Sequence, residues 1–406
     1  MNILFIHQYY FPEMSGTARR TKEIAETFAK KGHDVTVITS FPRSNRIMPG
    51  YKTKYYETIN NVKVHRLKNI FSVGKNPSIR MLSYFFSMLL TVYYISKKRK
   101  KYDMLISVSP LASGLAGAIA NYLYKIHHHF DVPDILPDLG IVAGMLKNKI
   151  LIKLLFKLEK WVYSHSNSIS LVTKGHIKNL INKDVSPSKI FWVPDWIDQN
   201  YYYQSLNKKM IINTKELFFT ENKIITFVGN IGALQAPDVF LDLMKMINRE
   251  KQYNVKFLFI GNGIMLSHLK KRIKLEKISN IQILGRIDRS QIPYFLNNSD
   301  ILISNYINDP ILDTYIPGKI FEYIISGKPI IMGGRGDVKE LLTKYNAGIA
   351  VEPSNPQKIK KGVYDILSGD YVCNTNIKEF LDIYSMENVI DKYNDLILKI
   401  NKYYKN

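Results

Sequence analysis

A short apolar strand, a loop and a helix recur along this chain of 406 residues, and this repeat restricts the folds open to it. Asn2–His7 is an apolar run that predicts a strand buried on both faces. Thr21–Lys31 has apolar residues at helical spacing and ends at Gly32, and Asp34–Thr39 predicts a second strand. A strand, a helix and a second strand within about 40 residues are typical of a doubly wound parallel α/β sheet.

The repeat is interrupted once, in the polar segment Gln199–Glu221, which we interpret as a linker. A second series of strands begins at Lys223–Val228, and each of its strands ends in a glycine or polar loop. The sequence therefore predicts two Rossmann-like domains, with the change of domain at residues 200/201. Ligands of such sheets bind at the carboxyl ends of the strands, so two domains with facing strand ends would enclose a cleft.

The glycine loops that follow the predicted strands narrow the class of ligand that this chain can bind. No GxGxxG follows Asn2–His7 or Lys223–Val228, which argues against NAD and FAD, and no GxxxxGK[ST] loop is present. Glycine-rich loops before helices remain, and these suit a diphosphate held by backbone N–H groups. The three histidines His127–His129 alternate between the two faces of a predicted strand, so we predict no metal site there.

The most specific cluster lies in Tyr315–Ile331. Pro317 and Gly318 open a predicted helix, and Lys319 and Glu322 share one face of it. Lys319 adds positive charge for a phosphate, and Glu322 can accept hydrogen bonds from ribose hydroxyls. The alternative is a capped surface helix with an ordinary Lys/Glu pair.

The segment PGKIFEYIISGKPII, residues 317–331, resembles the donor-site signature of family 4 retaining glycosyltransferases of the GT-B class. Further segments resemble that family in the same order along the chain: FPEMSGTARR at 11–20, FDVPDILPD at 130–138, KIFWVPDWID at 189–198, FVGNIG at 227–232 and LGR at 284–286. The resemblance covers essentially the whole chain. Within the family, the chain is similar to the bacterial sugar transferases that build capsule, O-antigen or colanic acid.

The resemblance implies a GT-B fold with an acceptor-binding domain, residues 1–200, to which a helix at 385–406 returns, and a nucleotide-sugar-binding domain, residues 201–384. It implies no metal cofactor. Carried over by position, the donor-binding residues would be Gly16, Gly229, Asn230, Gly232, Arg286, Ile287, Asp313, Thr314, Pro317, Gly318, Lys319 and Glu322.

Two departures from the family pattern concern the chemistry. Thr314 stands where the family has the first of two glutamates eight residues apart, so Asp313 or a backbone group supplies the sugar contact, or catalysis is impaired. Ala233 and Ala236 occupy the loop in which the family has a basic pair, so charge neutralisation of the leaving diphosphate falls on Lys319 and Arg286.

The resemblance implies front-face attack, in which the leaving phosphate takes the acceptor proton, so no nucleophile is assigned. Asp134 and Asp138 follow a predicted strand of the acceptor domain and could orient hydroxyls or take the acceptor proton, or could simply turn the chain. Glu13 and Arg19 are the other acceptor-side candidates. Alongside Lys319 and Glu322, Asp134 and Asp138 complete our set of catalytic candidates.

The net charge of +23 predicts a polyanionic partner: nucleic acid, an anionic membrane or a phosphorylated substrate. The apolar segment Met81–Ser96 precedes five basic residues, and the predicted helix Asn148–Tyr163 carries a basic stripe, although either could be a helix with a solvated face. We expect these residues to dock on anionic lipid: Lys97, Lys98, Arg99, Lys100, Lys101, Lys149, Lys153, Lys157 and Lys160.

The expected reaction moves a hexose, N-acetylated or deoxy, from a UDP-sugar to a lipid-diphosphate-linked saccharide of a bacterial surface polysaccharide, at the inner face of the plasma membrane. GDP is the alternative to UDP. Alternative functions are transfer to a soluble acceptor, or nucleotide-sugar or partner binding without turnover. Nucleic-acid binding has only the charge in its favour. The single cysteine, Cys373, excludes an intramolecular disulfide.

Overall fold

The computed structural model describes residues 1–405 except 14, 43–46, 49, 69–76 and 209–221. The chain divides into two units by the contacts between its Cα atoms. Unit 1 comprises Met1–Pro194 and Ile390–Asn406, and unit 2 comprises Asp195–Val389. The chain thus changes unit at 194/195 and 389/390, a few residues from the positions that the sequence suggested.

Unit 1 contains an eight-stranded sheet in the order β3-β4-β2-β1-β5-β6-β7-β8. All neighbouring strands are parallel except β3, which is antiparallel to β4. The edge hairpin of β3 and β4 was not predicted. The strands are β1 (Asn2–Ile6), β2 (Asp34–Ser40), β3 (Tyr56–Ile59), β4 (Val62–Leu67), β5 (Met104–Val108), β6 (His127–Val132), β7 (Ser168–Leu171) and β8 (Ile190–Trp192).

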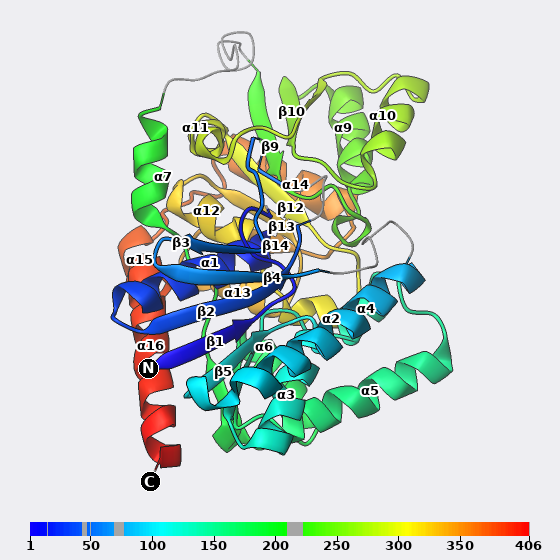
Figure 1. The fold of residues 1–406 in the computed structure, drawn as a ribbon. Helices are drawn as coiled ribbons and strands as arrows, with labels where there is room; N and C mark the ends of the chain where they lie inside the picture. Colours follow the sequence, from blue (N-terminus) through cyan, green and yellow to red (C-terminus); the bar gives the residue numbers. More distant parts are fainter. Residues whose placement is uncertain (14, 43–46, 49, 69–76, 209–221, 406) are drawn as a thin grey trace. The chain divides into compact units, whose positions relative to one another are not determined.

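Helices cover both faces of this sheet (Figure 1). On one face, α1 (Gly16–Lys30) packs through Phe28 on Phe5 of β1, with ring centres 6.0 Å apart. On the other, α2 (Pro77–Lys98) and α3 (Leu111–Tyr124) share a core with β1, β2 and β5. The remaining helices of this unit are α4 (Asp138–Val142), α5 (Lys149–Ser164) and α6 (Lys174–Asn182).

Unit 2 contains a wholly parallel six-stranded sheet in the order β11-β10-β9-β12-β13-β14. Its core is aromatic, since Phe227, Phe240, Phe257 and Phe259 are fully buried against one another. The strands are β9 (Lys223–Val228), β10 (Val255–Ile260), β11 (Ile281–Gly285), β12 (Ile301–Asn305), β13 (Ile330–Gly333) and β14 (Gly348–Val351). The predicted doubly wound α/β class is confirmed in both units.

The helices of unit 2 are α7 (Gln199–Leu206), α9 (Asp238–Glu250), α10 (Leu266–Leu275), α11 (Ile292–Asn297), α12 (Lys319–Ile325), α13 (Asp337–Lys344), α14 (Pro356–Ser368) and α15 (Ile377–Tyr384). The linker interpretation was wrong for α7, because Asp198 caps this helix and Tyr202 is buried with its hydroxyl donating to Asn297. The rest of the predicted linker, 209–221, lies outside the described residues.

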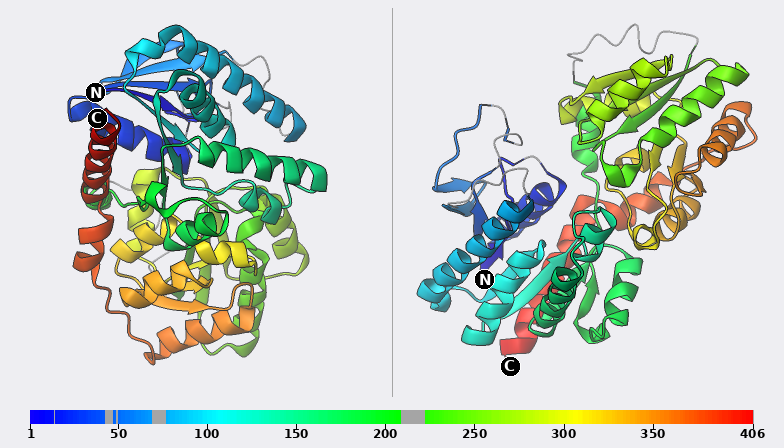
Figure 2. Two further views of the ribbon diagram at one scale, coloured as in Figure 1. Left: turned by 90° about the horizontal axis from the view of Figure 1, so that it is seen from below. Right: turned by 90° about the vertical axis from the view of Figure 1, so that its right-hand side faces the viewer.

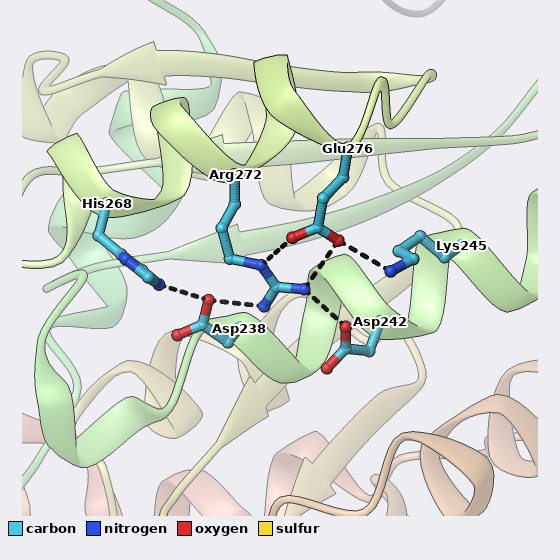
Figure 3. A network of polar contacts seen from close by, with 6 residues as sticks. All are labelled: Asp238, Asp242, Lys245, His268, Arg272 and Glu276. Atoms are coloured by element: carbon cyan, nitrogen blue, oxygen red, sulfur yellow. Dashed lines mark hydrogen bonds and ion pairs between the residues drawn. The ribbon is translucent and has the colours of Figure 1, made fainter.

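An ion-pair network joins α9 to α10 on the surface of unit 2 (Figure 3). The guanidinium of Arg272 lies 2.8 Å from both Asp238 and Asp242 of α9, and it also pairs with Glu276. Lys245 lies 2.8 Å from Glu276, and both cations lower the pKa of Glu276 to about 2 by hydrogen bonding. The network therefore fixes the position of α10 along α9.

The long helix α16 (Met386–Lys405) begins in unit 2 and continues into unit 1. Its start is held by Ile197, whose backbone N–H donates to Tyr384 and whose carbonyl accepts from Met386. In unit 1 the buried Tyr393 packs on Phe28 of α1. The predicted return of the chain to the first domain is confirmed.

Candidate functional site

The loops after β9 and β10 are joined backbone to backbone in unit 2. The N–H of Gly229 donates to Ile260 O at 2.8 Å, and that of Ile231 donates to Asn262 O at 3.0 Å. A Cβ on Gly261 would lie 1.8 Å from the carbonyl oxygen of Gly229, so the close approach requires glycine. The sequence GNIG at 229–232 is therefore held by its neighbouring loop at the carboxyl edge of the sheet.

Lys319, at the start of α12, is directed toward the GNIG loop. Its Nζ lies 3.8 Å from the centre of the Phe227 ring and 3.0 Å from where a Cβ of Gly229 would stand. This Nζ is buried and has no hydrogen-bond partner among the residues that the structure describes. Because burial disfavours the charged form, the pKa of Lys319 is lowered from 10.5 to about 7. The structure thus brings together two predicted donor residues, Gly229 and Lys319, and outside the undescribed segments no carboxylate pairs with the ammonium.

Glu322, one turn further along α12, is paired with a residue that the sequence did not single out. Arg289 Nη2 lies 3.4 Å from Glu322 Oε1, and its guanidinium also stacks over the Tyr201 ring at 4.5 Å. Arg286 and Ile287 lie in the same loop after β11, where Arg286 is exposed and Ile287 is half-buried. The signal that could have found Arg289 is its place in that loop, three residues after Arg286.

Asp313 and Thr314 lie in the 3₁₀ turn Pro310–Thr314, which follows β12. The Thr314 hydroxyl donates to Ile311 O at 2.7 Å, so it is used within the turn. Asp313 Oδ1 accepts from Arg335 Nε at 3.3 Å. Gly336 has φ +59°, and a Cβ on it would lie 2.1 Å from the carbonyl oxygen of Asp313. Of the two residues at the position of the family's first glutamate, Thr314 is hydrogen-bonded within the turn and Asp313 is paired with Arg335.

Asn305 at the end of β12 ties three loops together, and sequence reasoning missed it. Its side chain is fully buried, donates to Gln235 O at 3.0 Å and accepts from Ser354 N at 2.8 Å. Near it, Asn230 is exposed and its amide lies against Gly232. Asn305 therefore fixes the loop that contains Ala233 and Ala236, where no basic pair stands.

The acceptor-side candidates occupy unit 1. Gly16 is the exposed first residue of α1, Glu13 is buried just before it, and Arg19 lies 3.9 Å from Glu23. The predicted contact of Gly16 with the donor, and those of Glu13 and Arg19 with an acceptor, stay predictions.

Asp134 and Asp138, which follow β6, have different surroundings. Asp134 is half-buried. Asp138 is almost fully buried and its carboxylate accepts from Lys183 at 2.5 Å. Lys183 also pairs with Glu159, whose pKa is raised to about 7 mainly by burial. The Asp138 carboxylate is thus part of an ion-pair cluster with Lys183 and Glu159, and the acceptor-side roles of Asp134 and Asp138 stay predictions.

A buried ion pair that the sequence did not reveal lies at the carboxyl end of β6. Arg20 of α1 binds both carboxylate oxygens of Asp131, at 3.0 and 3.2 Å, and also donates to Val193 O and Pro194 O. Asp131 belongs to the FDVPDILPD segment, so at least one carboxylate of that segment stabilises the fold of unit 1.

The histidines that precede Asp131 on β6 are also engaged within the sheet. His128 and His129 form hydrogen bonds with serine hydroxyls, and burial lowers the pKa of each to about 3.

All nine predicted membrane-docking cations are exposed: Lys97, Lys98, Arg99, Lys100, Lys101, Lys149, Lys153, Lys157 and Lys160. Lys160 is paired with Asp184 at 2.9 Å. Within the described part of the chain, none of the helices has the length and apolar character needed to cross a bilayer.

Two wholly or mainly parallel α/β sheets, a glycine loop at a strand end and a helix that returns to the first unit define a GT-B glycosyltransferase fold. Sequence comparison agrees with this class. Residues 15–196 match the glycosyl transferase 4-like domain, and residues 209–379 match the glycosyl transferases group 1 family. The chain is a glycosyltransferase that belongs to these families.

Individual relatives and solved structures are similar over most of the chain. A protein of Escherichia coli assigned to colanic acid biosynthesis as a glycosyl transferase, WcaI, is 23% identical, over 90% of this chain and 92% of its own. The structure of Anabaena Alr3699/HepE in complex with UDP-glucose superposes with a TM-score of 0.72 at 13% identity, over 98% of this chain and 100% of the other. WaaG, a glycosyltransferase involved in lipopolysaccharide biosynthesis, superposes with a TM-score of 0.70 at 14% identity, over 97% and 99%.

Proposed function

We propose that this glycosyltransferase moves a hexose, N-acetylated or deoxy, from a UDP-sugar to a saccharide carried on a lipid diphosphate. In this proposal the transfer retains the configuration of the sugar and needs no metal. The enzyme attaches peripherally to the inner face of the plasma membrane and extends a bacterial surface polysaccharide.

The observation that supports the donor most directly is the buried ammonium of Lys319. An unpaired cation beside a glycine loop is costly unless an anion joins it, because burial penalises the charged form. A diphosphate placed against the GNIG loop would provide that anion. Lys319 would then stabilise the negative charge that develops on the leaving diphosphate, which is where a transferase of this kind needs stabilisation most.

Glu322 supports a nucleotide rather than a bare diphosphate. It lies three residues from Lys319 on α12, and its carboxylate, which pairs with Arg289, is of a kind that accepts hydrogen bonds from ribose hydroxyls. Alr3699/HepE, which shares the fold, binds UDP and UDP-glucose, and this favours UDP as the first base to test.

The acceptor is proposed from unit 1 and from the relatives. Exposed basic residues gather at the end of α2 and along α5, as expected of a protein that works on anionic lipid. WcaI is assigned to colanic acid biosynthesis and WaaG is involved in lipopolysaccharide biosynthesis. Both assignments favour a lipid-linked saccharide over a soluble acceptor.

Calorimetry with UDP, GDP, TDP and CMP, followed by donor hydrolysis with the matching sugars, tests the proposal. We expect UDP to bind, the wild type to hydrolyse a UDP-sugar slowly, and Glu322→Ala to lose both at least about tenfold. Lys328→Ala, a change in the connection between α12 and β13, is the matched control and should change neither. If no nucleotide binds to the wild type, the proposal is wrong.

A second candidate rests on the ion pair between Asp313 and Arg335. If that pair closes the sugar site, the chain binds nucleotide sugar without turnover. UDP binding would then be intact, and wild type and Glu322→Ala would both lack hydrolysis and transfer.

A further inference from the structure

The α2 helix buries hydroxyl groups and exposes apolar side chains. On its inner side, Ser83, Ser87 and Thr91 have exposed fractions of 0%, 7% and 4%. On its outer side lies a stripe of large apolar residues, defined here as the α2 stripe, with exposed fractions of 45% for Leu82, 54% for Phe85, 46% for Leu89 and 63% for Tyr93. A helix on the surface of a water-soluble protein has the opposite arrangement.

Hydrogen bonds hold the inner side of α2 in place. Ser87 Oγ lies 3.2 Å from Ser40 Oγ at the end of β2 and 3.4 Å from Gln8 Nε2 after β1. Thr91 donates to the carbonyl of Ser87 at 2.8 Å. The fully buried Ile95 completes this side. The rotation of α2 about its axis is therefore fixed, and the α2 stripe cannot turn inward.

Basic side chains lie over tyrosine rings where α2 ends and the 3₁₀ turn Arg99–Lys101 follows. Lys97 lies over the ring of Tyr93 at 5.6 Å, and Lys98 lies over that of Tyr94 at 5.1 Å. Arg99 and Lys101 make similar contacts with Tyr124 and Tyr102, both at 5.4 Å. Tyrosine and lysine share the boundary between lipid tails and headgroups, because each has an apolar body and a polar end.

We propose that α2 lies flat in the interfacial layer of an anionic bilayer, with the α2 stripe against the acyl chains and Lys97–Lys101 on the lipid phosphates. The stripe runs from residue 82 to residue 93, or roughly 17 Å along the helix axis. Its length and its basic end suit a helix that lies in the surface rather than one that crosses it. This inference rests on the proposed function, in which the acceptor is anchored in the membrane. Figure 2 shows α2 along the outside of unit 1, beside α3.

Sedimentation with vesicles of phosphatidylcholine, with and without phosphatidylglycerol, tests this surface. We expect Phe85→Ser/Leu89→Ser to weaken binding to mixed vesicles at least about tenfold, since two large apolar side chains leave the lipid. The matched control is Ile264→Ser/Leu275→Ser in unit 2, which removes side chains with exposed fractions of 84% and 70% and should leave vesicle binding unchanged.

A second pair of variants tests the contribution of the basic residues at the end of α2. Lys97→Gln/Lys98→Gln/Lys100→Gln should remove most of the preference for phosphatidylglycerol, whereas Lys270→Gln/Lys271→Gln/Lys274→Gln on α10 should not. Equal vesicle binding by the wild type and the α2 variants would overturn the proposal. So would a dimer that dissociates on Phe85→Ser/Leu89→Ser in lipid-free sedimentation velocity, because the stripe would then bind a second copy.

Donor binding separates this inference from the proposed function. The α2 variants should bind UDP as the wild type does, since every donor candidate except Gly16 lies in unit 2 and Gly16 belongs to α1. A wild type that binds vesicles through α2 but no nucleotide would sustain the inference and refute the proposed function. A wild type that binds UDP and ignores vesicles would overturn the inference and leave only the donor part of the proposed function standing.

Discussion

Lys319 Nζ lies 3.8 Å from the centre of the Phe227 ring, and in the described part of the chain this ammonium has no hydrogen-bond partner. The ring attracts the cation only weakly compared with a phosphate, so Lys319 is arranged to receive an anion.

The first prediction is a pH dependence of donor binding. Burial lowers the pKa of Lys319 to about 7, and a diphosphate should raise it again by pairing with the charged form. UDP affinity should therefore fall as the pH rises above 7, by up to about tenfold per pH unit. Calorimetry in buffers of different ionisation enthalpy should detect close to one proton taken up at pH 8. Lys319→Met should bind UDP weakly and without this proton uptake, and an unchanged pH profile in that variant would contradict the assignment.

The same group affects stability without ligand. The unfolded chain keeps the Lys319 proton up to about pH 10.5, whereas the folded chain releases it near pH 7. The folded protein should thus gain stability between these pH values, and Lys319→Met should reduce that gain. Thermal unfolding of both proteins from pH 7 to pH 10 measures the difference.

The second prediction concerns the ribose. Glu322→Gln should weaken UDP binding by about 1–2 kcal/mol, because a charged acceptor is replaced by a neutral one. It should weaken binding of 2′,3′-dideoxy-UDP much less. Arg289→Ala, which frees Glu322 from its 3.4 Å partner, should lower UDP affinity by a smaller factor. Equal losses for UDP and the dideoxy analogue would show that Glu322 does not contact the ribose.

The third prediction separates sugar from nucleotide. If Asp313 supplies the missing sugar contact, Asp313→Asn should lower turnover of the UDP-sugar at least about tenfold and leave UDP affinity within about twofold. Thr314→Val is the control, since the Thr314 hydroxyl donates to Ile311 O within the local turn. A loss of turnover in Thr314→Val that equals the loss in Asp313→Asn would exclude the assignment.

The fourth prediction tests the joined glycine loops. A Cβ on Gly263 would lie 2.1 Å from the carbonyl oxygen of Ile231, so Gly263→Ala should destabilise the fold by ~1–3 kcal/mol and weaken UDP binding. Gly362 of α14 has room for a Cβ, which would lie 3.6 Å from Ile331. Gly362→Ala should therefore be neutral or stabilise by up to about 1 kcal/mol. Urea unfolding of the two variants checks both signs.

The fifth prediction concerns the network of Figure 3. Arg272→Gln leaves three carboxylates facing one another, so it should lower the unfolding temperature in low salt and less so in high salt. The pKa of Glu276, about 2, lies below the usual 4.5, so this carboxylate stabilises the fold above pH 4.5 and loses that effect as the pH falls toward 2. The acid sensitivity should therefore decrease in Arg272→Gln, whereas exposed Arg249→Gln should behave as the wild type.

The class of fold and the strand ends could be predicted from the sequence, because they depend on local patterns, and the same kind of pattern made Lys319 and Glu322 donor candidates. The partners of the candidate side chains could not be predicted. Arg289 is 33 positions from Glu322, and Arg335 is 22 positions from Asp313, so only the packing of separate loops brings them together. The apolar character of α2 could be predicted from the sequence. Which side of α2 faces solvent could not, because it depends on hydrogen bonds of Ser87 with Gln8 after β1 and Ser40 of β2.

The return of α16 into unit 1 affects the order in which the protein can be made. The ribosome translates all of unit 2 before residues 390–406 exist, so Tyr393 and its neighbours reach the α1 face of unit 1 late. The 2.9 Å hydrogen bond between His33 and Asn394 can form only after Asn394, 361 positions later in the chain, has been synthesised. During synthesis unit 2 can therefore complete its core first, and unit 1 acquires its missing helix only afterwards.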